Sequence, residues 1–343
     1  MLVSVTGGTG FLGIHSVAAI VAHGHRVRLL ARDPDAAGRT LARLDVDPGA
    51  VDLAAGDVTD PPSVERALRG ADAVLHAASV YSFDSRRHPE MRRTNERGTE
   101  VVLAAARRIG ADPVVHVSSV VALLPAGGRT IGAHTPVGRP RETYAASKAA
   151  ADRIARRHQR DGAPVLISYP PALLGPEDPK IGDQTGRLRD TLRGLMPIWP
   201  TGGFPVGDVR DTAGLHARLL TAPRDGADRH FGPGRHLSTR QYLHTLREVT
   251  GRALPALHLP ARAMLPVGAA ADLLQRAWPW HLPAEYGAVW TCAHAVPVEA
   301  GASTGGLRPR PAAETMADTV RWLHGRGLLT DRQAGAIAGE KNR

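Results

Sequence analysis

The sequence is short of several residue types, and each shortage excludes a class of protein. A single cysteine, Cys292, in 343 residues excludes an intrachain disulfide and fits a reducing cytoplasm. The nearest candidate for a membrane span, residues 254–274, is interrupted by Arg262, Pro266 and Asp272. No basic segment followed by an apolar run and a cleavage site opens the chain. We therefore expect a cytoplasmic protein with no membrane association.

Patterns typical of metal sites and nucleic-acid interfaces are also missing. The 16 histidines show no spacing such as His-Glu-x-x-His and there is no cysteine cluster, so we expect no metal site. The net charge is +10, but the basic residues are scattered, often beside acids as in Arg32-Asp33, and aromatic residues make up only 4%. This dispersal gives nucleic-acid binding little support and leaves attraction of small anionic ligands as the milder consequence.

The first motif with chemical meaning is the glycine-rich segment Thr6-Gly-Gly-Thr-Gly-Phe-Leu-Gly13. It lies between an apolar run at residues 2–5 and a helix-like stretch at residues 14–23. In this context glycines let a pyrophosphate approach the free N–H groups of a helix N-terminus. A plain glycine-rich loop is the alternative, but the flanking strand and helix favour dinucleotide binding. The predicted cofactor contacts here are Gly7, Thr9, Gly10, Phe11, Leu12 and Gly13.

Arginines follow the second predicted strand, residues 27–31, at the position that reads the adenosine ribose. A base there suits a ribose 2′-phosphate, whereas an acid suits a free 2′-hydroxyl. Arg32 stands first and Arg39 lies a turn or so beyond, so we favour NADP(H) over NAD(H). Asp33 is the complication, because it could serve the hydroxyl instead. Both arginines could also be solvated surface residues of an arginine-rich chain.

Two further strand ends supply candidate cofactor contacts. Asp57, followed by Val58, ends a third apolar segment and either accepts from an adenine amino group or serves as a loop acid or helix N-cap. The strand at residues 73–76 runs into Ala77, Ala78 and Ser79, whose small side chains leave room for a cofactor. His76, which ends that strand, is expected to be packed rather than catalytic.

The segment Tyr144-Ala-Ala-Ser-Lys148 combines two residue types that the chain uses rarely. There are five tyrosines, and only three of the 43 basic residues are lysines. The alanines predict a helix with Tyr144 and Lys148 on one face. A phenol titrates near ~10, and we expect the ammonium to lower the pKa of Tyr144. An exposed pair on an amphipathic helix is the alternative. Ser119, after the strand at residues 114–117, could donate to a substrate carbonyl, although Ser118-Ser119 alone is a turn signal.

These motifs together resemble the extended short-chain dehydrogenase/reductases, the NAD-dependent epimerase/dehydratase family. They are Thr-Gly-x-x-Gly-x-x-Gly at 6–13, Asp57-Val58, His76-x-Ala78, Asn95, Ser118-Ser119 and Tyr144-x-x-x-Lys148. Later segments, such as Gly207-Asp-Val-Arg-Asp211 and Leu307-Arg-Pro-Arg-Pro311, resemble the dihydroflavonol-reductase-like and 3β-hydroxysteroid-dehydrogenase-like branch. The resemblance reaches to about residue 327 and is specific for the superfamily, much less so for the substrate.

The resemblance implies an α/β fold, a Rossmann-type doubly wound parallel sheet with a smaller C-terminal substrate lobe. Residues 1–170 are expected to form the NADP-binding domain, to which residues 205–237 return. Residues 171–204 and 238–327 are expected to form the substrate lobe, with Trp278, Trp280 and Trp290 in core or lid packing. Residues 328–343 would be a peripheral tail. A homodimer through helices beside Tyr144 is the family's habit.

The resemblance also implies roles for individual residues. Tyr144 would be the general acid/base, Lys148 would lower its pKa and hold the nicotinamide ribose, and Ser119 would orient the carbonyl. Asn95 would hold structure near the active site. Pro170 and Ala172, with Tyr144 and Lys148, complete the predicted cofactor contacts, and the predicted substrate contacts are Tyr81, Ser119, Tyr144 and Phe204.

The expected function is that of an NADP(H)-dependent ketone or aldehyde reductase, or alcohol dehydrogenase, acting on a hydrophobic or aromatic small molecule. A nucleotide-sugar epimerase or dehydratase with NAD is the alternative. Pro170-Pro171 and Phe204 count against it, because they stand where epimerases bind the diphosphate through an asparagine and an arginine. A non-catalytic NADP-sensing regulator is a third reading, which the presence of Ser119, Tyr144 and Lys148 disfavours.

Overall fold

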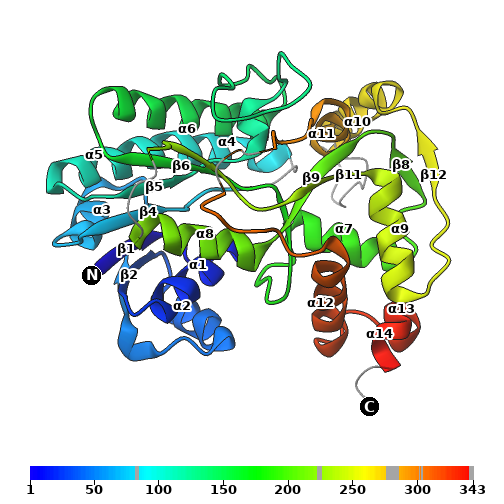
Figure 1. Cartoon of the computed structure of the whole chain (residues 1–343), viewed down its shortest axis with the longest axis horizontal. Helices are drawn as coiled ribbons and strands as arrows, with labels where there is room; N and C mark the ends of the chain where they lie inside the picture. Colours follow the sequence, from blue (N-terminus) through cyan, green and yellow to red (C-terminus); the bar gives the residue numbers. More distant parts are fainter. Residues whose placement is uncertain (82–84, 222–225, 276–285, 301, 303, 340–343) are drawn as a thin grey trace.

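The computed structural model describes residues 1–81, 85–221, 226–275, 286–300, 302 and 304–339. Its centre is a seven-stranded parallel sheet with the strand order β10-β6-β5-β4-β1-β2-β3 (Figure 1). These strands are β1 (Leu2–Thr6), β2 (Arg26–Ala31), β3 (Val51–Ala55), β4 (Ala73–His76), β5 (Val114–Val117), β6 (Val165–Tyr169) and β10 (Arg229–Phe231). The predicted doubly wound α/β sheet is confirmed, and its strand order reverses between β1 and β4.

The strands form where the sequence has short runs of Val, Leu and Ile. β4, β5 and β6 are buried at every position, as expected for parallel strands that are covered on both faces. Successive residues point to opposite faces, so Val74 packs in one core and Leu75 in the other. β3 at the edge of the sheet instead exposes Asp52 and Leu53.

Helices cover both faces of the sheet (Figure 1). One face carries α3 (Pro61–Leu68), α5 (Gly98–Ile109) and α6 (Thr143–Arg160), and the other carries α1 (Phe11–Ala22), α2 (Pro34–Leu41) and α8 (Val209–Thr221). Short helical segments are α4 (His88–Arg92), the π-helical turn Arg93–Arg97 and the 3₁₀ turns Ala42–Leu44, Pro48–Ala50, Ser85–Arg87 and Val120–Leu123. Each face therefore has its own hydrophobic core against the sheet.

A second lobe stands beside the carboxyl edge of the sheet (Figure 1). It has two small sheets, ordered β11-β9-β7 and β12-β8. Its strands are β7 (Ala172–Leu174), β8 (Ile198–Pro200), β9 (Gly203–Asp208), β11 (Arg235–Ser238) and β12 (Leu257–Leu259), and its helices are α7 (Asp183–Leu192), α9 (Thr239–Thr250), α10 (Ala261–Gln275), α11 (Tyr286–His294), α12 (Ala312–Gly325), α13 (Asp331–Ala334) and α14 (Ala336–Gly339). The rings of Trp199, Phe204 and Tyr242 pack together in its core.

The segment 205–237 divides between the two lobes. α8 and β10, in its middle, join the large sheet, whereas β9 and β11 at its ends pair with each other in the small sheet. Trp290 is buried in the core beneath α6, and Trp278 and Trp280 lie outside the described residues.

The predicted peripheral tail is a correction, because its described part, residues 328–339, is packed. Leu329, Ala334 and Ile337 are at most 3% exposed and join the core of the second lobe against α9 and α12. Two one-turn helices are too short to bury their apolar side chains by themselves. Here these side chains are buried because the helices dock on the second lobe. Residues 340–343 lie outside the described part.

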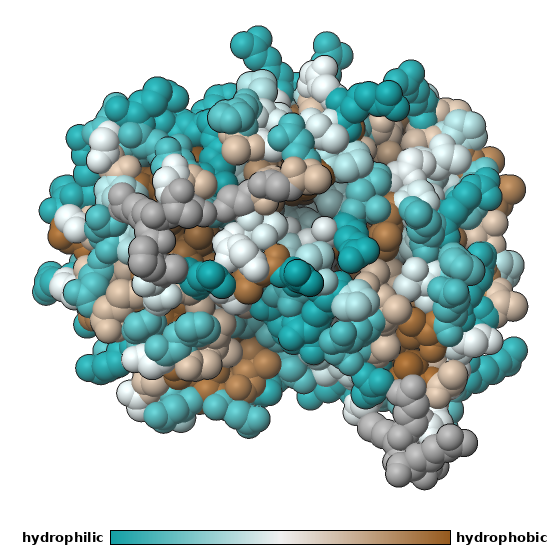
Figure 2. All heavy atoms as spheres, viewed as in Figure 1, coloured by the Kyte–Doolittle hydropathy of each residue, from teal (hydrophilic) through white to brown (hydrophobic). Residues whose placement is uncertain are grey.

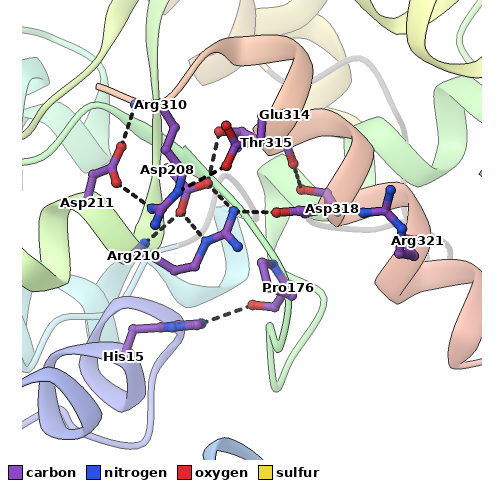
Figure 3. Close-up of polar contacts among 11 residues, drawn as sticks. His15, Pro176, Asp208, Arg210, Asp211, Arg310, Glu314, Thr315, Asp318 and Arg321 are labelled. Atoms are coloured by element: carbon purple, nitrogen blue, oxygen red, sulfur yellow. Dashed lines mark hydrogen bonds and ion pairs between the residues drawn. The ribbon is translucent and has the colours of Figure 1, made fainter. Parts of the chain in front are cut away.

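A polar network joins the second lobe to the start of α8 (Figure 3). Asp208 accepts hydrogen bonds from the backbone N–H of Arg210 (2.8 Å), from its guanidinium (2.7 and 2.9 Å) and from Thr315 of α12 (2.9 Å). Arg210 also donates to Asp318 of α12 at 2.7 Å. His15 of α1 contacts the carbonyl of Pro176 at 3.0 Å in the same region. The network fixes α12 against both lobes.

The surface is largely hydrophilic on the face shown in Figure 2, where apolar residues form only small, separate groups. Large exposed apolar side chains include Leu195 in the loop after α7, Leu257 on β12 and Val267 on α10. Within the described ranges, no helix has both the length and the apolar character needed to cross a bilayer.

Candidate active site

A cleft of about 550 Å³ lies at the carboxyl ends of the sheet strands, between the sheet and the second lobe. In doubly wound sheets the switch point, here between β1 and β4, opens such a crevice. Every residue predicted for the site lines this cleft except Arg39. Residues from six sheet strands or their following loops, β1 to β6, therefore meet there with residues of α7, β9 and α11.

The glycine-rich turn forms one end of the cleft. A Cβ on Gly13 would overlap the carbonyl oxygen of Gly7, and one on Gly7 would overlap the backbone of Ala78, so neither position can carry a side chain. A Cβ on Gly10 would meet only the Gly7 oxygen, at 3.4 Å. Gly10 is the N-cap residue of α1, whose first turn has no acidic residue and no capping side chain. Open space and free N–H groups together suit a pyrophosphate.

The two predicted arginines lie differently with respect to the part of the cleft beyond β2, where the adenosine ribose is expected; we call this part the ribose end. Arg32 lines the cleft, and its side chain is 70% exposed, with a long 3.9 Å contact to Glu90. Asp33 caps α2 by accepting from the N–H of Ala36 at 2.9 Å, so its carboxylate is committed to the helix. Arg39 lies in the last turn of α2 and outside the cleft. Of the two predicted arginines, Arg32 lines the cleft and Arg39 does not.

Asp57 lines the cleft next to Arg32 and is fixed by its own loop. Its carboxylate accepts from the N–H of Thr59 at 2.8 Å and from the Thr59 hydroxyl at 2.7 Å. Burial alone would raise the pKa of Asp57, but the bonds from Thr59 and the charges of Arg32 and Arg93 outweigh it and lower that pKa. The carboxylate is ionised at neutral pH, and Asp60, not Asp57, caps α3.

Ser119 and Tyr144 meet in the middle of the cleft. Ser119 follows β5 and caps the 3₁₀ turn Val120–Leu123, and its side chain hydrogen-bonds Tyr144. Tyr144 enters from the first turn of α6, which Glu142 caps by accepting from the N–H groups of Tyr144 (2.9 Å) and Ala145 (2.7 Å). The two hydroxyl groups that sequence reasoning assigned to the carbonyl thus lie together.

The predicted acidification of Tyr144 by Lys148 is wrong. Burial raises the pKa of Tyr144 above its ordinary value, the bond from Ser119 lowers it less, and the charges of Glu142 and Asp183 raise it further. The ammonium of Lys148 is instead directed to the carbonyl of Val117, at 3.2 Å. The phenol is therefore fully protonated at neutral pH, because a buried phenolate loses solvation that this ammonium does not replace.

Lys148 lies below Tyr144 on α6 and is only 5% exposed. Burial lowers the pKa of Lys148 to about 8, against an opposing attraction from Asp152. Behind it, His76 and His116 stack with ring centroids 5.4 Å apart, and burial and the charge of Lys148 lower the pKa of His76 to about 3. His76 is held between Thr6 (2.7 Å) and Thr99 (3.1 Å), so it is packed, as its sequence context predicted.

Asn95 lies in the π-helical turn before α5 and ties two walls of the site together. Its amide accepts from the N–H of Val80 at 2.8 Å and donates to Ser147 at 3.0 Å. Ser147 in turn donates to the carbonyl of Tyr144 at 2.8 Å. The loop after β4 is thereby fixed to the first turn of α6, which is the structural role that the resemblance implied for Asn95.

The substrate end of the cleft is less apolar than the sequence suggested. Tyr81 packs edge-on against Tyr144, with centroids 4.6 Å apart, and its hydroxyl accepts from Gln184 of α7 at 3.2 Å. Asp183 and Arg187 of the same helix also line the cleft. The lining also has apolar residues, which include Val121, Leu124, Ile131, Phe204, Ala288, Ala295 and Val296.

Sequence reasoning missed the charged and amide side chains of α7 that line the cleft, Asp183, Gln184 and Arg187. They lie within residues 171–204, which were expected to belong to the substrate lobe, with Phe204 as the predicted substrate contact there. Asp183, Gln184 and Arg187 have helical spacing, which places them on one face, and that periodicity was the available signal. Among the residues described, no three His, Cys, Asp or Glu side chains are grouped so that they could hold a metal ion.

Comparisons with known proteins agree with this geometry. Residues 3–232 match the model of the NAD dependent epimerase/dehydratase family. The chain is 29% identical over 338 residues to the sterol demethylase protein B of Methylococcus capsulatus, covering 96% of this chain and all of that protein. It is 31% identical over 281 residues to the 4-hydroxy-2-methyl-3-oxo-4-farnesyl-3,4-dihydroquinoline-1-oxide ketoreductase of Stigmatella aurantiaca, covering 80% of each.

A solved structure shares the fold over nearly the whole chain. The dTDP-glucose 4,6-dehydratase DesIV of Streptomyces venezuelae, a double mutant with NAD and DAU bound, superposes with a TM-score of 0.74 at 25% identity. The superposition covers 95% of this chain and 98% of that one.

Proposed function

This chain belongs to the NAD-dependent epimerase/dehydratase family and is an enzyme of the NAD(P)-dependent short-chain dehydrogenase/reductase type, and from that premise we propose that it is an NADP(H)-dependent reductase. Its substrate would be the ketone or aldehyde group of a hydrophobic small molecule, or the corresponding alcohol in reverse. The observation that carries the proposal is the meeting of Ser119 and Tyr144 in one cleft, with Lys148 behind them.

The chain's own residues would supply a proton and its placement. When bound, the nicotinamide cofactor supplies the hydride to the carbonyl carbon. Tyr144, protonated at neutral pH, would give its proton to the carbonyl oxygen as negative charge develops there. Ser119, which is hydrogen-bonded to Tyr144, would donate a second bond to the same oxygen. The ammonium of Lys148 would stabilise the phenolate that remains.

The preference for NADP(H) rests on the ribose end. Arg32 lines the cleft with an exposed guanidinium, whereas Asp33 is engaged as the cap of α2. A planar guanidinium suits the oxygens of a phosphate. An acid free to accept from a 2′-hydroxyl, which NAD would require, is not supplied by Asp33.

The substrate class follows from the far end of the cleft. Its apolar wall suits a hydrophobic skeleton, and the polar face of α7 suits one oxygen-bearing group at a distance from the reacting carbonyl. The names of two relatives, one a sterol demethylase protein and one a farnesyl-quinoline ketoreductase, point to large apolar substrates in those proteins.

A Tyr144→Phe variant tests the reaction. The variant keeps the ring and its contact with Tyr81 but has no proton to give, so turnover should fall by roughly 100-fold or more while NADPH binding stays near that of the wild type. The measurement is NADPH oxidation with a panel of aromatic, aliphatic and steroidal ketones, together with NADPH binding by fluorescence.

A matched control is Tyr242→Phe, which removes a hydroxyl from a buried tyrosine in the core of the second lobe, outside the cleft. It should keep turnover within a few-fold of the wild type. Full turnover in Tyr144→Phe would remove Tyr144 from the reaction.

The cofactor preference has its own test. Arg32→Ser should weaken NADPH binding by about tenfold and leave NADH binding unchanged, because the lost bonds go to the 2′-phosphate alone. Arg39→Ser is the control, since Arg39 lies outside the cleft, and both affinities should stay as they are. Equal weakening of NADPH and NADH by Arg32→Ser would contradict the assignment.

A nucleotide-sugar epimerase or dehydratase is the second candidate. Lys180 and Arg187 line the cleft and could attract a diphosphate, and a dehydratase of this fold carries NAD. Pro170 and Phe204 oppose it, because neither side chain can hydrogen-bond a diphosphate. Tightly bound NAD in the purified protein, with no NADPH oxidation in the ketone panel, would favour this candidate.

A further inference from the structure

Four charged or polar side chains follow one another at every fourth position on α6. They are Tyr144, Lys148, Asp152 and Arg156, and a spacing of four places them in a row on one face of a helix. The first two line the cleft, and the next two continue the row beneath it. Asp152 is 0% exposed, although a buried carboxylate is costly unless it is paired.

Asp152 has two partners, one on each carboxylate oxygen. The hydroxyl of Ser118 donates to Oδ2 at 2.8 Å. Nε of Arg156 lies 2.7 Å from Oδ1, but its N–H is not aligned with that oxygen, so the contact is an ion pair rather than a hydrogen bond. Arg156 is held in turn by donating to the hydroxyl of Tyr169 at 3.0 Å.

The Ser118 contact connects the two halves of the site. Ser118 continues the line of β5, since its N–H donates to the carbonyl of Ser168 at 2.8 Å, and the next residue is Ser119. Asp152 stands on the helix that carries Tyr144 and Lys148. Its carboxylate therefore adds a buried side-chain link between the strand end that presents Ser119 and the helix that presents the other two groups.

The charges around Lys148 leave Asp152 as its counter-charge. His76 of β4 and His116 of β5 face it from the sheet, and burial lowers the pKa of each well below neutrality, so both are uncharged. Tyr144 is also uncharged at neutral pH. Arg156 lies one helical step further along the row, beyond Asp152. The carboxylate of Asp152 is the group that favours the ammonium.

We propose that Asp152 is a positioning residue of the active site, which clamps the strand end of Ser119 to α6 through Ser118 and keeps Lys148 charged. The inference deepens the proposed reductase and rests on it for its catalytic meaning. The two effects are separable, because one depends on a hydrogen bond and the other on charge.

Two variants with opposite charge changes test the electrostatic part. Asp152→Asn keeps an oxygen that can accept from Ser118 but removes the negative charge and leaves Arg156, so Lys148 should lose its proton at lower pH. Arg156→Gln leaves the carboxylate without its nearest cation, so Lys148 should lose its proton at higher pH. A purely structural role would move the titration of Lys148 in neither direction.

The titration can be read directly because the chain has only three lysines, Lys148, Lys180 and Lys341. NMR of protein labelled with ¹³Cε-lysine, without cofactor, gives a pH midpoint for each, and Lys180→Arg and Lys341→Arg assign the signals. We expect Asp152→Asn to lower the Lys148 midpoint from about 8 by about 1 pH unit and Arg156→Gln to raise it. An unchanged midpoint in Asp152→Asn overturns the proposal.

Folding is controlled separately. If Arg156→Gln fails to give a native circular dichroism spectrum, the double variant Asp152→Asn/Arg156→Gln removes both charges together. Asp152 is the nearer charge to Lys148, so this variant should lower the midpoint, by less than Asp152→Asn alone. A midpoint equal to that of the wild type would count against Asp152.

The clamp is tested by kinetics. Ser118→Ala breaks the bond to Asp152 without changing charge, so it should lower kcat by roughly tenfold and leave the Lys148 midpoint in place. In Asp152→Asn, kcat should instead begin to fall at a lower alkaline pH than in the wild type, because Lys148 loses its proton at lower pH. If the protein shows no reductase activity, the NMR result still reports whether Asp152 sets the titration of Lys148. If the enzyme is active but the Lys148 midpoint does not change in Asp152→Asn, the role of Asp152 is wrong and the proposed reductase is unaffected.

Discussion

Asp152 and Asp208 are two of the most deeply buried carboxylates in the described chain, 0% and 1% exposed, yet their surroundings differ. Asp208 receives four hydrogen bonds, three from Arg210 and one from Thr315 (Figure 3). Asp152 receives one, from Ser118, and pairs with Arg156 without an aligned bond. Asp208 lies outside the cleft, whereas Asp152 lies one helical step below Lys148.

The difference shows how a buried carboxylate is used. Both carboxylate oxygens of Asp208 accept hydrogen bonds that hold α8 and α12 together, and a fully hydrogen-bonded group of this kind fixes structure. Asp152 keeps part of its charge available to a neighbour that lines the cleft. Replacement of Asp208 should therefore mainly lower the free energy of unfolding. Replacement of Asp152 should mainly change the titration of Lys148 and the turnover of the enzyme.

Asp208→Asn is the variant with the largest expected effect on stability. It keeps the size of the side chain but leaves Arg210 facing an amide, which should lower the free energy of unfolding by about 3 kcal/mol. Urea unfolding followed by circular dichroism measures this loss. Turnover of the folded fraction should remain, because Asp208 is not part of the cleft.

The pH dependence of that loss checks its cause. Burial alone would raise the pKa of Asp208, but the bonds from Arg210 and Thr315 outweigh it and lower that pKa. A carboxyl whose pKa is lowered on folding stabilises the protein above its ordinary pKa of about 4, and this contribution is lost as the pH falls. The difference in the free energy of unfolding between the wild type and Asp208→Asn should therefore become smaller below about pH 4. A constant gap would mean that packing, not charge, is responsible.

The same contrast explains what could be predicted from the sequence. The glycine turn, Arg32 and the Tyr144–Lys148 pair depend on residues close in the chain, within one strand, turn or helix, and their patterns predicted the sheet and most of the cleft. The bond from Thr315 to Asp208 spans 107 residues, and that from Ser118 to Asp152 spans 34. No local pattern records such contacts.

The protonation of Tyr144 could not be predicted for a related reason. The sequence supplied the neighbouring charge of Lys148 but not the burial of the phenol, nor the carbonyl of Val117 that holds the ammonium. Desolvation depends on the whole tertiary environment and here exceeds the effect of one neighbour. The burial of Leu329, Ala334 and Ile337 was missed for the same reason, because these side chains are buried only by packing against α9 and α12.

Asp211, three residues from Asp208, should give the smallest effect in this comparison. It accepts from the N–H of Arg310 at 2.7 Å and from its guanidinium at 2.5 Å. Burial raises the pKa of Asp211, the contacts with Arg310 lower it less, and the charge of Asp208 raises it again. The folded state therefore favours the uncharged form, so ionised Asp211 adds little stability at neutral pH.

Asp211→Asn should consequently change the free energy of unfolding by less than about 1 kcal/mol, because the amide oxygen can still accept from the Arg310 N–H. Arg310 also keeps its ion pair with Glu314 at 3.3 Å. The same urea measurement compares the two Asp→Asn variants directly. A loss of free energy of unfolding as large as that of Asp208→Asn would contradict this prediction. It would show that the contact between α8 and α12 depends on total negative charge rather than on which carboxylate is fully hydrogen-bonded.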